Sequence, residues 1–239
     1  MDIIKHVAPL CYLCFYLFTS PLVTSVNVDH HLLSVQWPNS YCSVPFTSKT
    51  AGRKIPKCRR RIPQEFTIHG LWPQGSNSQR LRDCVNNSLP AGLSRTKKVL
   101  DKFMELQNVL HKIWPSLDND DLAFWINQWE SHGSCSGLEE QWVTATKRLY
   151  ELADVAKLTG KFKVNTLYTV DEVQSIISSV TKWVTTVKCS IDRNGHIVFH
   201  EIHFCADASA RILKNCSEIP GWNASRGCTT NRAIFPPLP

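Results

Sequence analysis

The sequence has no internal repeat, no low-complexity tract and no break in composition that would divide its 239 residues. This length suits one large domain or two small ones. Because nothing marks a boundary, the sequence predicts a single domain over residues 26–239. Hydrophobic residues make up 43% of the chain, which is enough to bury a sizeable core at this length.

No apolar run in the chain is long enough to cross a bilayer, which takes about 20 residues. The one candidate, Val7 to Phe18, is too short, so a membrane anchor is the weaker alternative. Lys5 and His6 precede this run, and Val23-Thr24-Ser25 follows it as a small-residue cleavage site. The pattern predicts a signal peptide over residues 1–25 and a secreted, extracellular mature protein with no membrane segment.

Acidic residues are outnumbered, with 20 Asp and Glu against 27 Lys and Arg, for a net charge of +7. A basic exported protein is attracted to polyanions, among them RNA, although cell-wall pectin fits equally well. The densest basic cluster is Arg59 to Arg61, with Lys54 and Lys57, shortly before His69. A solvated loop explains this cluster as well as an RNA contact does.

Ten cysteines are present, of which Cys11 and Cys14 would leave with the signal peptide. An even set in an exported chain indicates disulfides, whose pairing the sequence leaves open. Sequons at Asn86, Asn215 and Asn223 predict glycosylation in the secretory pathway. The eight cysteines that remain are Cys42, Cys58, Cys84, Cys135, Cys189, Cys205, Cys216 and Cys228.

Hydrophobic periodicity predicts an α+β fold, with a central antiparallel sheet packed by several helices. Phe66 and Ile68 alternate with Thr67 and His69, which predicts a half-buried strand that Gly70 and Pro73 end. Arg193-Asn194-Gly195 indicates a hairpin between the last two strands. The predicted strands cover residues 32–36, 65–69, 185–191 and 196–205, and the predicted helices cover 94–114, 118–132, 141–157 and 171–180.

Two segments, Phe66–Pro73 and Phe124–Cys135, each hold one histidine among aromatic residues, with a glycine directly after it. Taken alone, His69 fits a buried core residue and His132 fits a helix end, where the dipole favours a cation. A bridge between Cys84 and Cys135 would bring the two neighbourhoods together. The pair therefore favours a catalytic interpretation.

Two imidazoles suit RNA cleavage without a metal or another cofactor. A base removes the ribose 2′-hydroxyl proton, and an acid protonates the departing 5′-oxygen, and both roles fit a side chain with a pKa near 6.5. Negative charge gathers at phosphorus in the transition state and needs cationic or hydrogen-bonding neighbours. Aromatic side chains beside the histidines offer stacking surfaces for bases.

The two segments resemble the active-site motifs of the ribonuclease T2 family, and the resemblance extends over nearly all of the mature chain. Gln36-Trp37-Pro38, Ile113-Trp114-Pro115 and Glu201–Cys205 are further stretches similar to plant members. The resemblance implies a monomeric endoribonuclease that cleaves single-stranded RNA through a 2′,3′-cyclic phosphate. It implies His69, His132 and Gln128 as catalytic residues, Trp72, Phe124, Trp125, Gln36 and Ser131 as substrate-binding residues, and the disulfides Cys42–Cys58, Cys84–Cys135, Cys189–Cys228 and Cys205–Cys216.

The second segment departs from the family pattern at two positions. Gln128 stands where a glutamate is usual, and Ser131 stands where a lysine is usual. Losing one donor near the transition state costs about 3 kcal/mol, on the order of a hundredfold in rate. The departures predict a slow enzyme, and the alternative is a non-catalytic homologue with a binding, defence or storage role. The residues do not decide which histidine is the base, although family mechanisms often assign that role to the second motif.

The basic charge resembles that of the self-incompatibility ribonucleases of plant styles. This likeness implies entry into pollen tubes, degradation of RNA there, and pollen F-box proteins as partners. A different function, metal binding, is suggested by His196, His200, His203 and Cys205. Strict alternation along one strand would point His196 and His200 away from the other two, so no metal site is expected.

Overall fold

The computed structural model describes residues 27–48, 52–85, 90–228 and 232–236. The predicted signal peptide and the sequon at Asn86 lie outside these residues.

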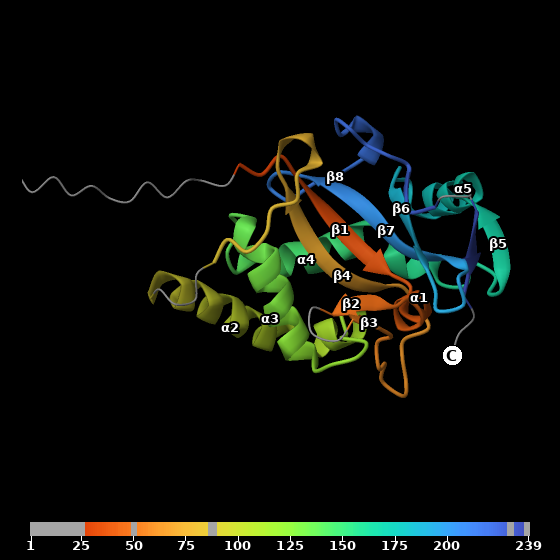
Figure 1. Ribbon diagram of the computed structural model, residues 1–239. Helices are drawn as coiled ribbons and strands as arrows, with labels where there is room; N and C mark the ends of the chain where they lie inside the picture. The colour runs from red at the N-terminus through yellow and green to blue at the C-terminus, as the bar shows by residue number, and fades with distance from the viewer. Residues whose placement is uncertain (1–26, 49–51, 86–89, 229–231, 237–239) are drawn as a thin grey trace, which may run out of the picture.

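A central sheet organises the chain, and helices lie behind it and beside one edge (Figure 1). In the described residues the sheet has eight strands. Five of them follow the order β4-β1-β7-β10-β5; of the other three, β6 and β8 pair with β7, and β9 pairs with β6. The strands are β1 (His30–Gln36), β4 (Thr67–Gln74), β5 (Thr166–Thr169), β6 (Thr186–Ile191), β7 (Ile197–Asp207), β8 (Leu213–Lys214), β9 (Ser225–Arg226) and β10 (Arg232–Phe235); β2 (Phe46–Ser48) and β3 (Gly52–Lys54) form a separate hairpin.

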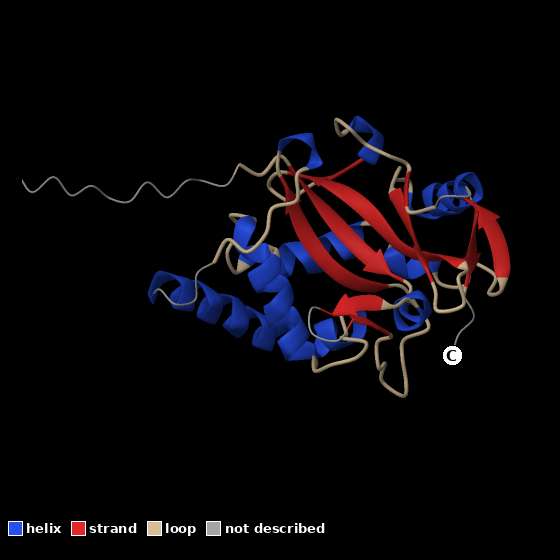
Figure 2. Cartoon of the chain, in the orientation of Figure 1, coloured by secondary structure: helices blue, strands red, loops and turns tan. Residues whose placement is uncertain are grey.

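The predicted α+β class is confirmed, with two refinements. Most strand pairs are antiparallel, but β10 pairs parallel with β7 and β6 pairs parallel with β9, so the sheet is mixed. The prediction that Gly70 and Pro73 end the second strand is wrong, because β4 continues to Gln74 in register with β1. Figure 2 shows that helices and strands occupy separate layers.

The helices are α1 (Pro38–Ser43), α2 (Pro90–Ile113), α3 (Asp121–Ser131), α4 (Gln141–Leu152) and α5 (Val170–Thr181). Helix α3 begins after Asp120, whose carboxylate accepts a hydrogen bond from the Ala123 amide at 3.0 Å. Helix α4 ends earlier than its apolar pattern predicts, because Asp154 adopts a left-handed conformation with φ 52°. A single 3-10 turn, Val155–Leu158, continues its apolar face.

The two faces of the sheet have different roles. Leu33, Ile68 and Phe204 are fully buried in the main core, in the same cluster as buried residues of α2, α4 and α5. On the other face Leu32 packs with the Cys205–Cys216 disulfide in a smaller cluster. Alternation along β1 therefore separates core residues from residues on the face that carries the histidines.

A β-bulge in β4 changes which residues share a face. Ser34 pairs with Gly70 and Val35 pairs with Ile68, so His69 is the extra residue of the bulge. Ile68 and Leu71 both point into the core, three residues apart, where strict alternation would separate them. The bulge consequently brings His69 and Trp72 onto the same face of the sheet.

A second bulge lies in β7. Lys188 pairs with Glu201 and Cys189 pairs with Phe199, which leaves His200 as the extra residue. Phe199 and Ile202 both lie in the core, again three residues apart. The bulge places Glu201 on the face that carries His69.

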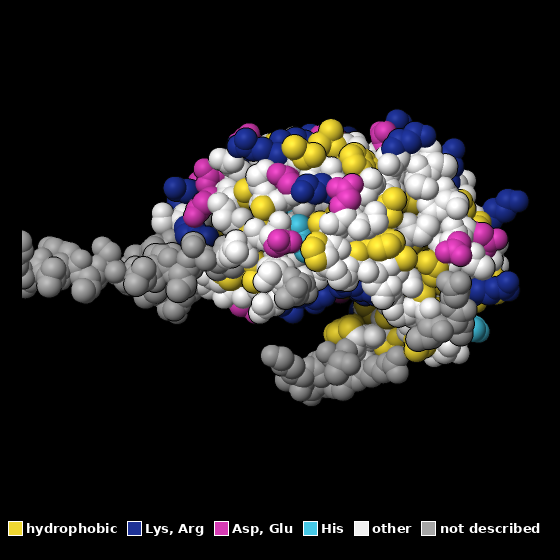
Figure 3. All heavy atoms as spheres, turned by 90° about the horizontal axis from the view of Figure 1, so that it is seen from above, with side chains coloured by type: hydrophobic (Ala, Val, Ile, Leu, Met, Phe, Trp, Pro, Cys, Tyr) yellow, Lys and Arg dark blue, Asp and Glu magenta, His cyan; other side chains and the backbone are white. Residues whose placement is uncertain are grey.

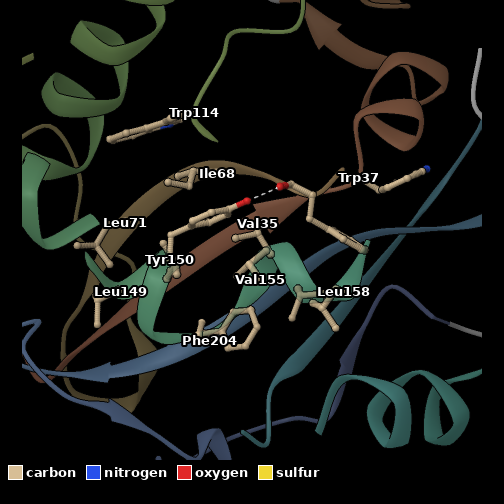
Figure 4. Packing of buried hydrophobic residues seen from close by; sticks show 14 of the residues in the cluster. Val35, Trp37, Ile68, Leu71, Trp114, Leu149, Tyr150, Val155, Leu158 and Phe204 are labelled. Atoms are coloured by element: carbon tan, nitrogen blue, oxygen red, sulfur yellow. Dashed lines mark hydrogen bonds between the residues drawn. The ribbon is translucent and has the colours of Figure 1, made fainter. Parts of the chain in front are cut away.

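Strand β4 is the edge of the sheet, and side chains bind outward carbonyl groups of this strand and of the residue before it. Trp114 and Trp142 donate from their indoles to the carbonyls of His69 and Leu71, each at 3.0 Å. Tyr150 donates to the carbonyl of Phe66 at 2.9 Å, and this hydrogen bond is drawn as a dashed line in Figure 4. Helices on one side thus fix the strand that carries His69.

The residues that the structure describes contain four disulfides, with the pairing that the family resemblance implies: Cys42–Cys58, Cys84–Cys135, Cys189–Cys228 and Cys205–Cys216.

Candidate active site

His69 is held by a buried carboxylate. Its Nδ1 lies 3.0 Å from Oε1 of Glu201, and its side chain is 24% exposed. With Nδ1 donating to this carboxylate, Nε2 is the ring nitrogen left to act on a substrate. The Phe124 ring stacks near the imidazole, with ring centroids 6.3 Å apart and planes inclined by 25°.

Glu201 is fully buried and is the centre of a polar cluster. Its Oε2 is 2.8 Å from His203 Nε2, 3.0 Å from Lys188 Nζ and 3.3 Å from the Ser34 hydroxyl. Burial alone would raise the pKa of Glu201, but hydrogen bonds from His203 and His69 and the charge of Lys188 hold it well below the usual value. Glu201 is therefore an ionised carboxylate aimed at His69.

Trp72 contacts both candidate catalytic histidines. Its ring centroid is 5.0 Å from that of His69 and 5.3 Å from that of His132. His132 ends helix α3 and is 7% exposed. Among the described residues, no group hydrogen-bonds to its Nδ1.

The environment of His132 favours the neutral imidazole. Burial lowers its pKa from 6.5 to about 3, and the positive charges of Arg82, His69 and Arg80 act in the same direction. The α3 dipole favours a cation at this position, whereas desolvation and the neighbouring arginines favour the neutral ring. The two histidines thus have opposite surroundings, one beside a carboxylate and one among cations.

Gln128 is oriented by Trp72. The indole Nε1 donates to the Gln128 Oε1 at 3.1 Å, which leaves the amide NH₂ to donate elsewhere. This contact needs a glycine at position 70, because a Cβ there would stand 2.3 Å from the Gln128 oxygen and 2.6 Å from the Trp72 nitrogen. A Cβ on Gly133 would stand 2.6 Å from the ring of Trp129.

The glycine that follows each histidine therefore has a steric cause. At position 70 the missing side chain leaves room for the site itself, and at position 133 it leaves room for the tryptophans that support the end of α3.

The remaining predicted substrate residues divide into two groups. Phe124 and Gln36 lie at the site; Gln36 pairs with Glu201 in the sheet, and its buried Oε1 has no partner among the described residues. Ser131 directly precedes His132, and its carbonyl accepts a hydrogen bond from the Asp83 amide at 3.2 Å. The prediction for Trp125 is wrong, because this ring is 1% exposed and stacks on Phe103 in the core.

The expected orientation of the late histidines is also wrong at one residue. His200 and His203 both approach Glu201, with Nε2 atoms at 4.0 and 2.8 Å from its oxygens, because the bulge in β7 interrupts the alternation. Cys205 is bonded to Cys216. Within the residues that the structure describes, no group of three or more His, Cys, Asp or Glu is arranged to hold a metal ion.

The basic cluster before His69 is partly structural. Arg59 forms an ion pair with Asp121 at 2.6 Å and donates to the carbonyl of Asn119. The same carboxylate binds His111, whose ring lies 5.1 Å from Trp125. Arg59 therefore ties its loop to the start of α3. Figure 3 shows basic and acidic side chains interspersed on one face of the molecule.

Sequence reasoning did not assign roles to Glu201, Lys188, Arg80 or Arg82. Glu201 appears in the family-like stretch of the last long strand, but neither its burial nor its partner can be read from that pattern. Arg80 and Arg82 follow the first motif closely in the sequence, and this proximity to Trp72 is the only signal that would have found them.

Two imidazoles beside one tryptophan, an oriented amide and nearby cations define a site suited to acid–base chemistry on a phosphodiester. The chain matches the model of the Ribonuclease T2 family over residues 28–216 and belongs to that family. It is 26% identical over 208 residues to intracellular ribonuclease LX of Solanum lycopersicum, covering 83% of this chain and 81% of that protein. It is 29% identical over 205 residues to ribonuclease S-2 of Antirrhinum hispanicum, covering 81% and 78% respectively.

The fold agrees with solved structures of the family. The crystal structure of RNase NT in complex with 5′-AMP superposes with a TM-score of 0.63 and 22% identity, covering 89% of this chain and 100% of that chain. A ribonuclease-like storage protein of Panax ginseng is also similar, at 23% identity over 192 residues, covering 77% of this chain and 73% of that protein. Among the described residues, no helix is both long enough and apolar enough to cross a membrane.

Proposed function

We propose that the protein is an endoribonuclease that cleaves single-stranded RNA by transesterification through a 2′,3′-cyclic phosphate. The observation that supports this most directly is that His69 and His132 both contact Trp72, with ring separations of 5.0 and 5.3 Å. Membership of the Ribonuclease T2 family supports the same activity.

The surroundings of the two histidines support a division of labour. His132 has a pKa lowered to about 3, so its ring is neutral near pH 7 and acts as the base that takes the 2′-hydroxyl proton. His69 is bonded through Nδ1 to the ionised Glu201, which stabilises the imidazolium and directs Nε2–H to the departing 5′-oxygen. The roles exchange when water later opens the cyclic phosphate.

The neighbours of the histidines supply the remaining elements of the mechanism. Gln128 presents its NH₂ to a non-bridging phosphate oxygen, because the indole of Trp72 holds its carbonyl oxygen. Phe124 borders His69 and is half-buried, so it offers a stacking surface for a base, whereas Trp72 is buried and acts through its contacts with His69, His132 and Gln128. Ser131 provides no positive charge, so we expect a slow enzyme unless a cation from another segment compensates.

The first experiment measures product ends from RNA incubated with the purified protein and with its His69→Ala and His132→Ala variants. We expect wild-type protein to release 2′,3′-cyclic phosphate ends and both variants to lose at least a thousandfold in rate. If wild type releases no more of these ends than the variants, the enzyme proposal is wrong.

A second experiment tests the assignment of acid and base. A uridine 3′-phosphodiester with a 4-nitrophenyl leaving group needs little protonation of the departing oxygen. We therefore expect His69→Ala to recover much of its activity on this substrate, whereas His132→Ala stays inactive. The opposite pattern would reverse the two roles.

The second candidate function is a non-catalytic storage or binding protein. It is favoured by Gln128 and Ser131, and a ribonuclease-like storage protein is among the relatives. The intact pairing of His69 with Glu201 counts against it, because a storage role needs no buried carboxylate behind an imidazole. The product assay above separates the two candidates.

We also propose that residues 1–25 direct secretion and that the mature, monomeric domain is glycosylated. Asn223 is exposed and its Oδ1 accepts from the Ser225 amide, which leaves its amide nitrogen accessible to a glycan. Asn215 is less suited, since its side chain bonds the Val184 amide and the Glu218 carboxylate beside the disulfide of Cys216. Mass analysis of the exported protein with and without a peptide N-glycosidase tests both proposals.

We further propose that the protein acts in self-incompatibility, with pollen F-box proteins as partners. It is supported by the charge of +7 and by the similarity to ribonuclease S-2. Expression restricted to the style would support this role, whereas expression in roots or stressed leaves would contradict it.

A further inference from the structure

The segment Arg80–Asp83 is fixed between strand β4 and the end of helix α3. Arg80 forms a β-bridge with Gln74, the last residue of β4. Asp83 donates its amide to the carbonyl of Ser131 at 3.2 Å. The next residue, Cys84, is covalently linked to Cys135. Arg80 and Arg82 are therefore carried by backbone that is anchored on both sides of the site.

The two arginines lie near His132. The guanidinium carbon of Arg80 lies 5.7 Å from the centroid of the Trp72 ring, and that ring lies 5.3 Å from the ring of His132. Arg82 and Arg80 also exert a positive potential on His132, which adds to the effect of burial on its pKa. Both arginine side chains are exposed, so an anionic ligand can reach them.

Other cations near the histidines are engaged elsewhere. In α3, all of whose residues the structure describes, the last turn carries no basic side chain, and Ser131 is uncharged. Lys188 is 3.0 Å from Glu201 and is neutralised by it. A phosphodiester that becomes more negative in the transition state needs a cation close by. Arginine suits this task, because its planar group offers several donors to phosphate oxygens.

We propose that Arg80 and Arg82 bind the scissile phosphate of RNA and stabilise its transition state from the side of His132, where helix α3 has no cation of its own. This inference rests on the proposed ribonuclease function. It predicts a higher rate of RNA cleavage than the absence of a lysine at position 131 would suggest.

The first test compares single neutral variants in RNA cleavage. We expect Arg82→Gln to lower kcat/KM by roughly a hundredfold and Arg80→Gln by roughly tenfold, with Arg82→Lys retaining more activity than Arg82→Gln. The control is Arg211→Gln, an exposed arginine after β7 that changes the net charge equally. Arg211→Gln should stay within threefold of wild type. Equal losses in Arg82→Gln and the control would mean that Arg82 acts only through the general electrostatic attraction of RNA to a basic protein, and this result would overturn the proposal.

The second test moves the charge onto the helix. Ser131→Lys in the Arg82→Gln background should raise kcat/KM at least tenfold, whereas Ser131→Lys in wild type should change kcat/KM by less than threefold. The two lysine effects would be equal if the residues acted independently. Equal effects would overturn the proposal.

A binding measurement separates this inference from the ribonuclease proposal. A 2′-deoxy dinucleotide has no attacking hydroxyl, so its affinity can be measured by calorimetry without cleavage. We expect Arg82→Gln to weaken binding about tenfold and Arg211→Gln to leave it unchanged. If RNA is not cleaved but this difference is seen, the ribonuclease proposal fails and the phosphate contact stands. If wild type and Arg82→Gln bind equally, or neither binds, the phosphate contact is refuted.

Discussion

Replacing Glu201 by glutamine removes one charge from the buried cluster and almost no volume. Glu201 Oε1 binds His69, while Oε2 binds His203, Lys188 and Ser34. An amide has only one oxygen. Whichever way it turns, its NH₂ faces either His69 Nδ1–H or the ammonium group of Lys188, and neither of these accepts a hydrogen bond.

The distances set the size of the expected effect. Opposite unit charges 3.0 Å apart attract by about 5.5 kcal/mol at an effective dielectric constant of 20. The His69 side chain is 24% exposed, so water recovers part of this energy for the imidazolium. We take roughly half to remain. About 3 kcal/mol corresponds to on the order of a hundredfold in kcat.

The assay is steady-state cleavage of a defined oligonucleotide by wild type, Glu201→Gln and Ser34→Ala. Ser34→Ala is the matched control, since it removes one hydrogen bond from the same carboxylate and leaves its charge. We expect a large fall in kcat for Glu201→Gln, little change in KM because Glu201 is 1% exposed, and less than a threefold change for Ser34→Ala. A Glu201→Gln enzyme within threefold of wild-type kcat would refute the role of this carboxylate.

Three further predictions concern the glycine of the first motif, one disulfide and acid pH. Gly70→Ala should lower kcat at least tenfold, because its Cβ would displace the Gln128 oxygen from Trp72; normal kinetics would contradict the steric reading. Cys84→Ser/Cys135→Ser should lower the free energy of unfolding by about 4 kcal/mol, because this disulfide joins residues 51 positions apart. Cys42→Ser/Cys58→Ser, with a separation of 16, should lower it by about 3 kcal/mol. Urea denaturation measures both losses, and a larger loss for the second pair would contradict the loop-closure argument. Burial lowers the pKa of His31, His132 and His200 from 6.5 to about 4, 3 and 4, so these groups contribute stability that is present above pH 6.5 and lost as the unfolded chain binds protons below it. The free energy of unfolding should therefore fall by up to about 4 kcal/mol per pH unit near pH 5, and a flat profile in urea titrations at pH 7, 6 and 5 would contradict these pKa values.

Periodicity in the sequence was sufficient for the long elements. Helices α2 to α5 and strands β1, β6 and β7 lie where the apolar spacing predicts them, because each has enough residues to reveal its period. Strands of two to four residues, such as β5 and β8, were missed because so short a run shows no period.

The site was predictable in its histidines and less so in its geometry. Strict alternation does not predict a bulge, so the sequence places His200 and His203 on opposite faces of the strand, whereas both approach Glu201. Neighbours on a helix are also ambiguous: Phe124 reaches His69 while Trp125 enters the core, and only packing decides between two adjacent aromatic residues. Glu201 could not be paired with His69 from the sequence, since 132 positions separate them.

The three aromatic donors along the outer edge of β4 also act as a register lock. A β-strand that slips by one residue turns every side chain to the other face, and a slip by two keeps the faces but shifts each carbonyl. Trp142 and Tyr150 belong to α4 and Trp114 follows α2, and the three side chains bind carbonyls of three different residues, so a slip by one residue breaks all three hydrogen bonds together. The same donors occupy an edge on which another chain would otherwise pair. The position of the first histidine along its strand is thus set from the helical side of the molecule, away from the face where RNA would bind.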